Sequence, residues 1–307
     1  MAANVETMFY VRETPWHRLG IKVEEALDSK EALEKSGLNW MVEQHNVIVD
    51  ERVMSKYKAN VRNSDQTVLG IVSDRYKIVQ NSEAFQFTDN LLKADVRYET
   101  AGALQEGKKV WMLAKMPETN ILGDNVEPYL VFTNSHDGTG AIKVALTPIR
   151  VVCQNTLNLA LNGAKRSWST KHMGNMEEKM LEAQRTLELA SIYIDKFEEE
   201  AERLASKKIT DIAFQEFLNS LFPIPEDATN RKIDNVKTVR ANLKLAYNAP
   251  DLANFKGTAY GVINAVSDMV THSTPLRNTD TYREGLFNKV IEGHPIIDKA
   301  YELIKVA

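Results

Sequence analysis

The spacing of the apolar residues changes near residue 175, and this change divides the chain into two kinds of structure. Before it, apolar and β-branched residues come in short runs separated by turn residues, which is typical of strands. These runs are residues 40–49, 53–61, 67–72, 110–116, 129–133 and 141–146. Beyond Gly174 the apolar residues recur at helical intervals. We therefore expect an α+β fold with two domains, a strand-rich one over residues 1–174 and a helical one over residues 175–307.

Two helices are expected among the strands of the first domain. Asn81 can cap a helix that runs to about Lys93, and a second helix should start near Gln154 and stop at Gly163. The first domain is accordingly expected to be an antiparallel, strand-rich domain with inserted helices.

One long helix is expected at the start of the second domain, because its apolar positions alternate between spacings of four and three residues. These positions are Met176, Met180, Ala183, Leu187, Ala190, Ile194, Phe197, Ala201 and Leu204. Such a heptad seam favours a coiled-coil-like helix that packs at a shallow angle against another helix, within the chain or in a second copy. Further helices are expected at about 211–221, 230–247, 257–271 and 282–304.

The composition excludes several classes of protein. Lys and Arg number 38 against 42 Asp and Glu, so the net charge of −4 does not suit a uniformly basic nucleic-acid coat. A single cysteine, Cys153, excludes a disulfide framework and a multi-cysteine zinc site, and we assign it no catalytic role. No segment has the pattern of a signal peptide or a membrane span. We expect a cytoplasmic protein that does not enter a membrane.

Two short strings resemble functional motifs. Residues 102–109, GALQEGKK, nearly spell a phosphate-binding loop, but Lys109 replaces the hydroxyl residue and a strand follows where a helix is needed. A hairpin turn is the expected structure there. His136 and Asp137 could orient an imidazole or a metal, although an Asp-Gly turn between strands is the simpler interpretation. No further histidine or cysteine stands at a metal-ligand spacing, so we expect no metal and no other cofactor.

The strongest lead is a segment without acidic residues. The 39 positions between Asp137 and Glu177 carry cations, amides and an indole, a set that suits a polyanion. The candidate nucleic-acid contacts are Lys143, Arg150, Asn155, Lys165, Arg166, Trp168 and Lys171. The alternative is a solvated loop whose tryptophan packs on the core.

A second basic stripe lies on the helix expected at 230–247. Lys237, Arg240 and Lys244 are spaced three and four residues apart and so share one face. They could extend a phosphate track, or they could be the ordinary outer face of an amphipathic helix.

Several longer strings carry a family resemblance. They are TPWHRLG at 14–20, VSDRYKIVQN at 72–81, SHDGTG at 135–140, TPIRVVCQNTL at 147–157 and GTAYG at 257–261. The chain thereby resembles the phage/plasmid-like protein family, a domain of unknown function found on bacteriophages, prophages and plasmids. The resemblance implies a mobile-element origin and a bacterial cytoplasm. In topology alone, the strand, turn and helix around 76–81 look like the core of ring-forming single-strand annealing recombinases, which implies a basic groove that holds one strand by its backbone.

Three functional hypotheses follow. The first is a non-enzymatic phage or plasmid protein that binds single-stranded DNA as a homo-oligomer and assists recombination or replication by strand annealing. The alternative is a host-interaction or counter-defence protein that binds a bacterial protein through its helical half, which the overall acidity and the heptad seam favour. The third is a metal-dependent nucleotide or nucleic-acid enzyme, for which the residues to test are His17, Asp74, His136 and Asp137.

Overall fold

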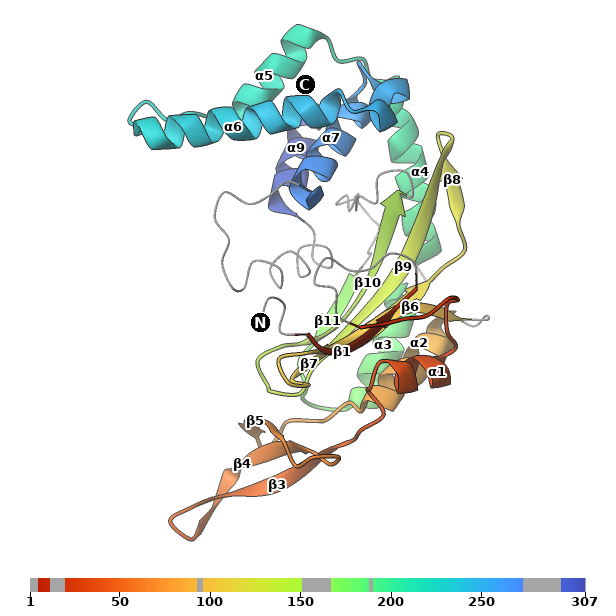
Figure 1. The fold of residues 1–307 in the computed structure, drawn as a ribbon, viewed down its shortest axis with the longest axis vertical. Helices are drawn as coiled ribbons and strands as arrows, with labels where there is room; N and C mark the ends of the chain where they lie inside the picture. The colour runs from red at the N-terminus through yellow and green to blue at the C-terminus, as the bar shows by residue number, and fades with distance from the viewer. Residues whose placement is uncertain are drawn as a thin grey trace. The chain divides into compact units, whose positions relative to one another are not determined.

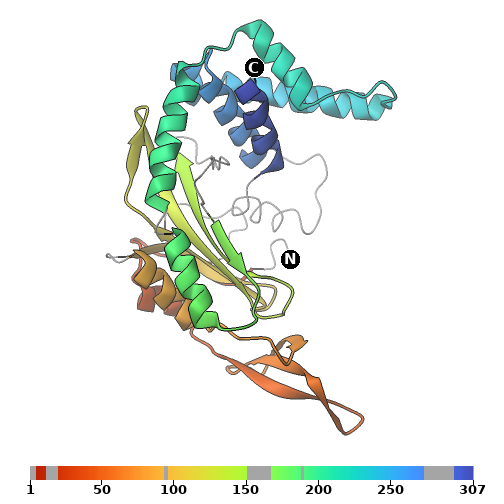
Figure 2. The same ribbon diagram turned by 180° about the vertical axis from the view of Figure 1, so that it is seen from behind.

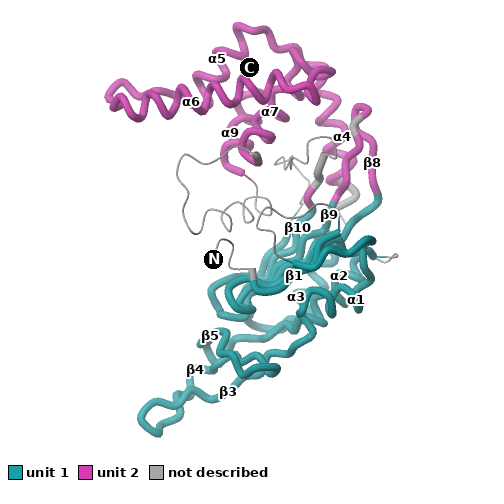
Figure 3. The backbone as a smooth tube through the Cα atoms, in the orientation of Figure 1, with its two compact units in different colours: residues 1–117, 129–146, 165–190 teal, residues 118–128, 147–164, 191–307 magenta. Residues whose placement is uncertain are grey.

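The computed structural model describes residues 5–11, 20–92, 96–150, 167–187, 190–272 and 294–306. Strands dominate the first half of the chain and helices the second, which confirms the α+β class (Figure 1). The chain forms two compact units, coloured separately in Figure 3. Unit 1 comprises residues 1–117, 129–146 and 165–190, and unit 2 comprises residues 118–128, 147–164 and 191–307. The division into two domains at residue 174 stays a prediction.

The larger sheet has eight strands in the order β11-β10-β9-β7-β6-β1-β2, with β8 paired to β9. Its pairs β1–β6, β6–β7, β7–β9, β8–β9 and β10–β11 are antiparallel, and β1–β2 is parallel. The strands are β1 (Val5–Tyr10), β2 (Ile21–Lys22), β6 (Arg97–Leu104), β7 (Lys109–Lys115), β8 (Thr119–Ile121), β9 (Asp124–Ser135), β10 (Ile142–Arg150) and β11 (Ser167–Thr170).

Three helices of unit 1 pack against this sheet. They are α1 (Ser29–Lys35), α2 (Asn81–Leu92) and α3 (Met176–Leu187), seen from two sides in Figures 1 and 2. The core contains Phe85 of α2 and Ala183 of α3 together with Tyr98, Met112 and Phe132 of the sheet. The alternation of buried and less buried residues along β7 places one face of that strand in this core.

A second, three-stranded antiparallel sheet has the order β3-β4-β5. Its strands are β3 (Val42–Val49), β4 (Arg52–Arg62) and β5 (Val68–Ser73), close to the runs expected from the sequence. The Asn60 side chain of β4 donates a hydrogen bond of 2.7 Å to the His136 carbonyl oxygen, which ties this sheet to the turn between β9 and β10.

Unit 2 is mainly helical. Its helices are α4 (Ala190–Ser206), α5 (Asp211–Leu221), α6 (Asn230–Tyr247), the 3-10 helix η1 (Pro250–Phe255), α7 (Ala259–His272) and α9 (Pro295–Val306). Thr210 and Thr229 cap α5 and α6 with their side-chain oxygens, as the threonine preference at such positions predicts. The helix expected at 154–163 and the first part of the one expected at 282–304 lie outside the described residues.

The heptad seam runs along two helices, α3 and α4, and residues 188–189 between them lie outside the described part of the chain. In α3, Met176 and Met180 pack against the core of unit 1 and Ala183 belongs to it. In α4, Phe197, Ala201 and Leu204 are buried. The α3 portion of the seam is therefore occupied within the chain and is not an open surface for a second copy.

Candidate nucleic-acid interface

Lys143 lies on a sheet face with a second lysine and a serine. On the antiparallel pair β10–β11 it is directly opposite Ser169, so the two side chains leave the sheet on the same face. Burial lowers the pKa of Lys143, and the positive charge of Lys109 on β7 lowers it further. The two ammonium groups repel one another, and the charge of Lys109 also lowers the pKa of Asp137, so a carboxylate already lies near this pair of lysines.

Trp168 lies on the opposite face of β11 from Ser169 and points into the core. It is only 8% exposed and packs in the cluster that contains Ile142 and Val144 of β10. The proposed role as a stacking platform for a base is therefore wrong for this residue, because its ring is covered by the hydrophobic core. The structure shows the alternative, a tryptophan that packs on the core.

The rest of the acid-free segment is only partly described. Lys171 is exposed directly after β11, and its carbonyl oxygen accepts a hydrogen bond of 3.1 Å from the Lys179 ammonium group. Asn155, Lys165 and Arg166 lie outside the described residues, as does the side chain of Arg150 at the end of β10. Their nucleic-acid contacts stay predictions.

The three candidates on α6 differ in their environments. Arg240 donates two hydrogen bonds, from Nε at 3.0 Å and Nη2 at 2.6 Å, to the carbonyl oxygen of Phe222. The Lys244 ammonium group donates to Gln215 Oε1 at 2.8 Å but remains exposed, and Lys237 is exposed. The guanidinium of Arg240 thus binds the C-terminal end of α5 through two of its nitrogens, and its contact with a phosphate stays a prediction.

Two further cations of α6, Arg231 and Lys232, are exposed. Over residues 230–239, the first half of the helix, no residue is buried. The helix carries five basic residues and one acidic residue, Asp234, among its 18. It is the most basic helix among those described, although the chain as a whole is acidic.

The segment between β9 and β10 is the Asp-Gly turn expected from the sequence. Asp137 Oδ1 accepts hydrogen bonds from the Ser135 hydroxyl and, at 2.9 Å, from the Thr139 amide. Burial acts to raise the pKa of Asp137, but these hydrogen bonds and the charge of Lys109 hold it below its usual value. The carboxylate is thus used to shape the turn.

His136, next to it, is fully buried. Its Nε2 lies 3.0 Å from Asn81 Oδ1, and because Asn81 Nδ2 donates to the Leu38 carbonyl oxygen, Nε2 is the nitrogen assigned the proton. Burial lowers the pKa of His136 to about 3, helped by His172 and opposed by Asp137. An imidazole with this pKa is neutral near pH 7 and poorly matched to act as a general base.

A second buried imidazole, His172, was not singled out by the sequence. Its ring stacks on Tyr76 at a centroid distance of 4.5 Å, and its Nδ1 lies 2.9 Å from the Lys77 carbonyl oxygen. Nδ1 of His136 and Nε2 of His172 have no hydrogen-bond partner among the described residues. Tyr76, on whose ring His172 stacks, donates its hydroxyl to the carbonyl oxygen of Ser135, the residue before His136, at 2.5 Å.

No metal centre accompanies these rings. Across the part of the chain that the structure describes, no group of three or more His, Cys, Asp or Glu side chains is placed to hold a metal ion. His17, a candidate for the enzyme hypothesis, and Cys153 lie outside the described residues. None of the described helices is long and apolar enough to cross a membrane.

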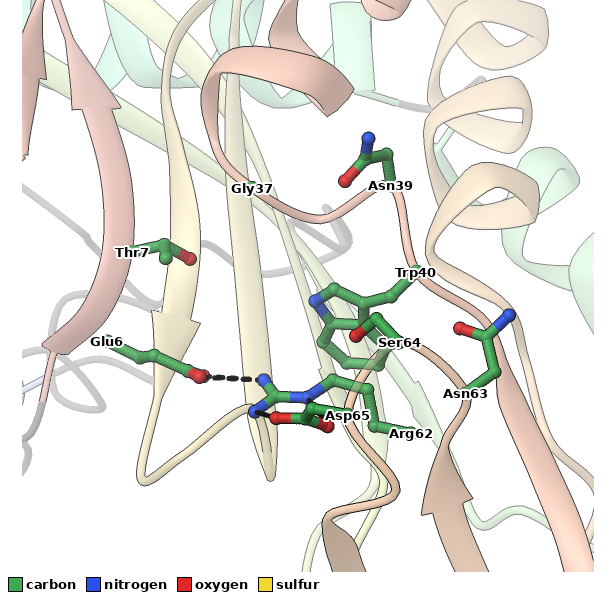
Figure 4. A pocket seen from close by; sticks show the side chains of 9 residues that line it. All are labelled: Glu6, Thr7, Gly37, Asn39, Trp40, Arg62, Asn63, Ser64 and Asp65. Carbon is green, nitrogen blue, oxygen red and sulfur yellow. Dashed lines mark hydrogen bonds and ion pairs between the residues drawn. The ribbon is translucent and has the colours of Figure 1, made fainter.

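A pocket of about 480 Å³ opens beside the β6–β7 hairpin. Figure 4 shows the Arg62 guanidinium held between the carboxylates of Glu6 and Asp65. It also lies 5.5 Å from the centre of the Trp40 ring. The hydrogen bonds that Arg62 donates to Asp65 and Glu6 raise the pKa of Arg62, while Arg62 lowers that of Asp65. Two carboxylates surround one cation, so this pocket is unsuited to a phosphate.

The GALQEGKK string forms the hairpin between β6 and β7, which confirms the turn and excludes a phosphate loop. Gly107 has a φ of +83°. A Cβ there would come within 2.8 Å of Arg62 Nη1, so the glycine is needed for the close approach of this turn to the pocket. The sequence pattern placed Lys109 in a turn. In the structure Lys109 is the first residue of β7, and its positive charge acts on Lys143 of β10.

Comparison with curated proteins finds no match. Comparison with solved structures likewise finds none. A family model described as a domain of unknown function, DUF932, matches residues 68–289, which is most of the chain and includes the turn with His136, β10, β11 and α6. The chain therefore belongs to the DUF932 family.

Proposed function

We propose that this chain binds single-stranded nucleic acid without catalysing a reaction, and that it assists recombination or replication by strand annealing. The observation that carries the proposal is α6, a helix that exposes four cations against one carboxylate and whose first half buries no residue. Like charges three and four residues apart on a helix repel one another. A phosphate backbone would relieve that repulsion and release its own counterions.

Unit 1 supports the proposal through Lys109 and Lys143. Their two positive charges, beside the Ser169 hydroxyl, would attract a phosphate group in addition to the nearby Asp137 carboxylate. The annealing role rests on the likeness in topology around residues 76–81. A mobile-element origin and a bacterial cytoplasmic location rest on the family resemblance carried by strings such as residues 72–81, 135–140 and 147–157.

Reversing charge on α6 is expected to weaken nucleic-acid binding. Arg231→Glu combined with Lys237→Glu should lower the affinity for a labelled single-stranded oligonucleotide at least tenfold at low salt. Two phosphate contacts are lost, so the slope of log affinity against log salt should become shallower by about 1.4, at about 0.7 per contact for single strands. Fluorescence anisotropy at several salt concentrations, with a duplex of the same sequence in parallel, measures both quantities.

A matched control comes from α1. Lys30→Glu combined with Lys35→Glu makes the same change of net charge at two exposed lysines of a helix that also carries Glu31 and Glu34. This control should bind like the wild-type protein. If both double variants lose the same affinity for the oligonucleotide, the effect is due to net charge alone. If the α6 variant binds with wild-type affinity, α6 is not part of the interface.

A second function, binding of a bacterial protein through the helical unit, is favoured by two apolar side chains. Ile212 of α5 and Leu245 of α6 are 74% and 73% exposed, more than any other large apolar residue described. Exposed residues of this kind are typical of binding surfaces when they are grouped. An affinity capture from bacterial lysate in which wild-type protein, but not Ile212→Asp with Leu245→Asp, retains one protein would favour this function over nucleic-acid binding.

A further inference from the structure

The three-stranded sheet β3-β4-β5 has one covered face. Asn60 of β4 donates its hydrogen bond to the His136 carbonyl oxygen. A Cβ at Gly70 of β5 would lie 2.5 Å from Asp137 Cα. Asn60 and Gly70 are directly opposite one another in the antiparallel ladder, so both contacts are on the same face. The turn between β9 and β10 therefore covers this face of the sheet.

The other face of the sheet carries two rows of side chains, because residues directly opposite one another share a face. His45, Ala59 and Ile71 form one row, and Glu43, Val61 and Val68 form the other. Ala59 and Val61 flank Asn60 along β4, so both rows lie on the face away from the turn. Val68 and Ile71 share this face although they are three positions apart, because the register shifts between Asn60 and Val61. We call this surface, with Tyr57 two positions before Ala59, the open face; its members are Glu43, His45, Tyr57, Ala59, Val61, Val68 and Ile71.

The open face leaves three large side chains in water. Tyr57, Val68 and Ile71 are 49%, 52% and 53% exposed. At on the order of 100 Å² for each half-exposed side chain, they present roughly 300 Å² of largely apolar surface. Ala59 and Val61, which are buried, fill the space between these side chains and β3. The apolar surface therefore continues from β5 across β4.

The sequence of β5 does not suit a strand with one face in water. Such a strand ordinarily alternates between apolar residues toward the core and polar residues toward the solvent. In β5, VLGIVS, Leu69 and Val72 are buried, and the two large residues on the open face, Val68 and Ile71, are apolar as well. The strand also carries no charged residue, although it is the edge of its sheet. This pattern is typical of a strand that is covered on both faces.

The charges of the open face favour a partner with the same surface. Its members include no Lys or Arg, so it offers no attraction for a polyanion. Its two titratable side chains at the β3 edge, Glu43 and His45, contact one another at 3.4 Å. The part of the face on β4 and β5 is uncharged, so two such faces can meet without setting like charges against one another. A surface that is complementary to itself is what a symmetric dimer requires.

We propose that the open face packs against the open face of a second copy of this chain. The two three-stranded sheets then stack about 10 Å apart, and Tyr57, Val68 and Ile71 of each copy are covered. The apolar area is small beside the roughly 800 Å² that each partner buries in an interface of standard size, so the dimer is weak and reversible, with a dissociation constant on the order of 10 μM. The contact does not depend on nucleic-acid binding, and it gives an interface to the homo-oligomer expected from the sequence.

The first experiment measures the mass of the full-length protein by analytical ultracentrifugation as a function of its concentration. The wild-type protein should dimerise, and Ile71→Lys, which places one ammonium group from each copy in an apolar interface, should raise the dissociation constant by roughly 100-fold. Tyr57→Lys on the neighbouring strand should act in the same direction. Ile21→Lys is the matched control, because Ile21 lies on β2 of the same unit and is 56% exposed, and it should dimerise like the wild-type protein. Unchanged melting temperatures of the variants show that the fold is retained.

The second experiment gives the open face opposite charges in two proteins. Val68→Lys with Ile71→Lys, and separately Val68→Glu with Ile71→Glu, should each be monomeric, whereas a mixture of the two at low salt should form a heterodimer.

Three results overturn the proposal. The first is a wild-type protein that sediments as a monomer at every concentration, as it would if another part of the same chain covered the open face. The second is association that survives Ile71→Lys or is lost equally in Ile21→Lys. The third is a mixture of the lysine and glutamate variants that stays monomeric. All readouts are masses in the absence of nucleic acid, so they leave the proposed nucleic-acid binding untouched.

Discussion

Between pH 6.5 and 4.5 the free energy of unfolding should fall by about 2 kcal/mol through His136 alone, with a slope that approaches 1.36 kcal/mol for each pH unit below the ordinary imidazole value. The folded protein holds the pKa of His136 at about 3, mainly through burial, against 6.5 for an unperturbed imidazole. Above pH 6.5 both the folded and the unfolded states are neutral at this residue, and its contribution to stability is complete. Below it, the unfolded chain binds a proton that the folded protein rejects, so stability is lost until the pH reaches about 3.

Most of this pH range lies above the ordinary pKa values of carboxylates, which are near 4, so the effect of the histidine can be distinguished from theirs. Burial also lowers the pKa of His172, which adds to the loss with the same sign. Urea unfolding at a series of pH values measures the slope. His136→Gln keeps a donor for Asn81 Oδ1 but cannot be protonated, so its unfolding free energy should depend less on pH than that of the wild-type protein.

His45→Gln is the control, because His45 is an exposed residue on β3. Its pH dependence should follow the wild-type curve. Parallel curves for His136→Gln and the wild-type protein would show that His136 binds a proton as readily in the folded protein as in the unfolded chain, which would contradict its burial.

Gly70→Ala should destabilise the protein by at least about 3 kcal/mol, the upper part of the range for overpacking, or prevent folding altogether. A Cβ at residue 70 would lie 2.5 Å from Asp137 Cα and 2.8 Å from Asp137 O. Both are backbone atoms of the turn between β9 and β10, so neither can rotate away as a side chain would. The alanine must push β5 away from the turn, and Asn60 on β4 would lose its hydrogen bond to the His136 carbonyl oxygen.

Gly123→Ala provides the comparison for this substitution. Its φ is +83° and a Cβ there would meet nothing within 4 Å, so only backbone strain of about 1 kcal/mol is expected. Thermal unfolding of the two variants should therefore show a much larger fall in melting temperature for Gly70→Ala. A Gly70→Ala protein as stable as the wild type would mean that β5 does not contact the turn as described.

Much of the fold follows from local sequence patterns. The hairpin over 102–109, the Asp-Gly turn after His136, and the threonine-capped helices α5 and α6 all depend on residues within a few positions of one another. Turn chemistry is short-range, which is why the sequence predicts these turns. The cap expected at Asn81 is wrong, because Asn81 is the first residue of α2 and its side chain binds the Leu38 carbonyl oxygen and His136 instead. The hydrophobic period likewise separated the strands from the helices.

The candidate site was less predictable, because it depends on which face of each element is covered. Ser169 and Trp168 alternate along β11, but only the packing of Ala183 and Val144 shows that the tryptophan side is the buried one. The spacing of Arg240 placed it on one helix face with Lys237 and Lys244. In the structure, however, the Arg240 guanidinium is hydrogen-bonded to the carbonyl oxygen of Phe222, which is 18 residues away in the chain.

The longest separations were beyond any local pattern. His172 stacks on Tyr76 across 96 positions, and Gly70 packs against Asp137 across 67. The chain's own residue pattern specified an α+β fold with turns and caps at defined positions, because those features form from neighbours in sequence. Only the tertiary structure decided which cations remain exposed and which histidines become neutral, because burial and charge pairing depend on residues brought together from distant parts of the chain.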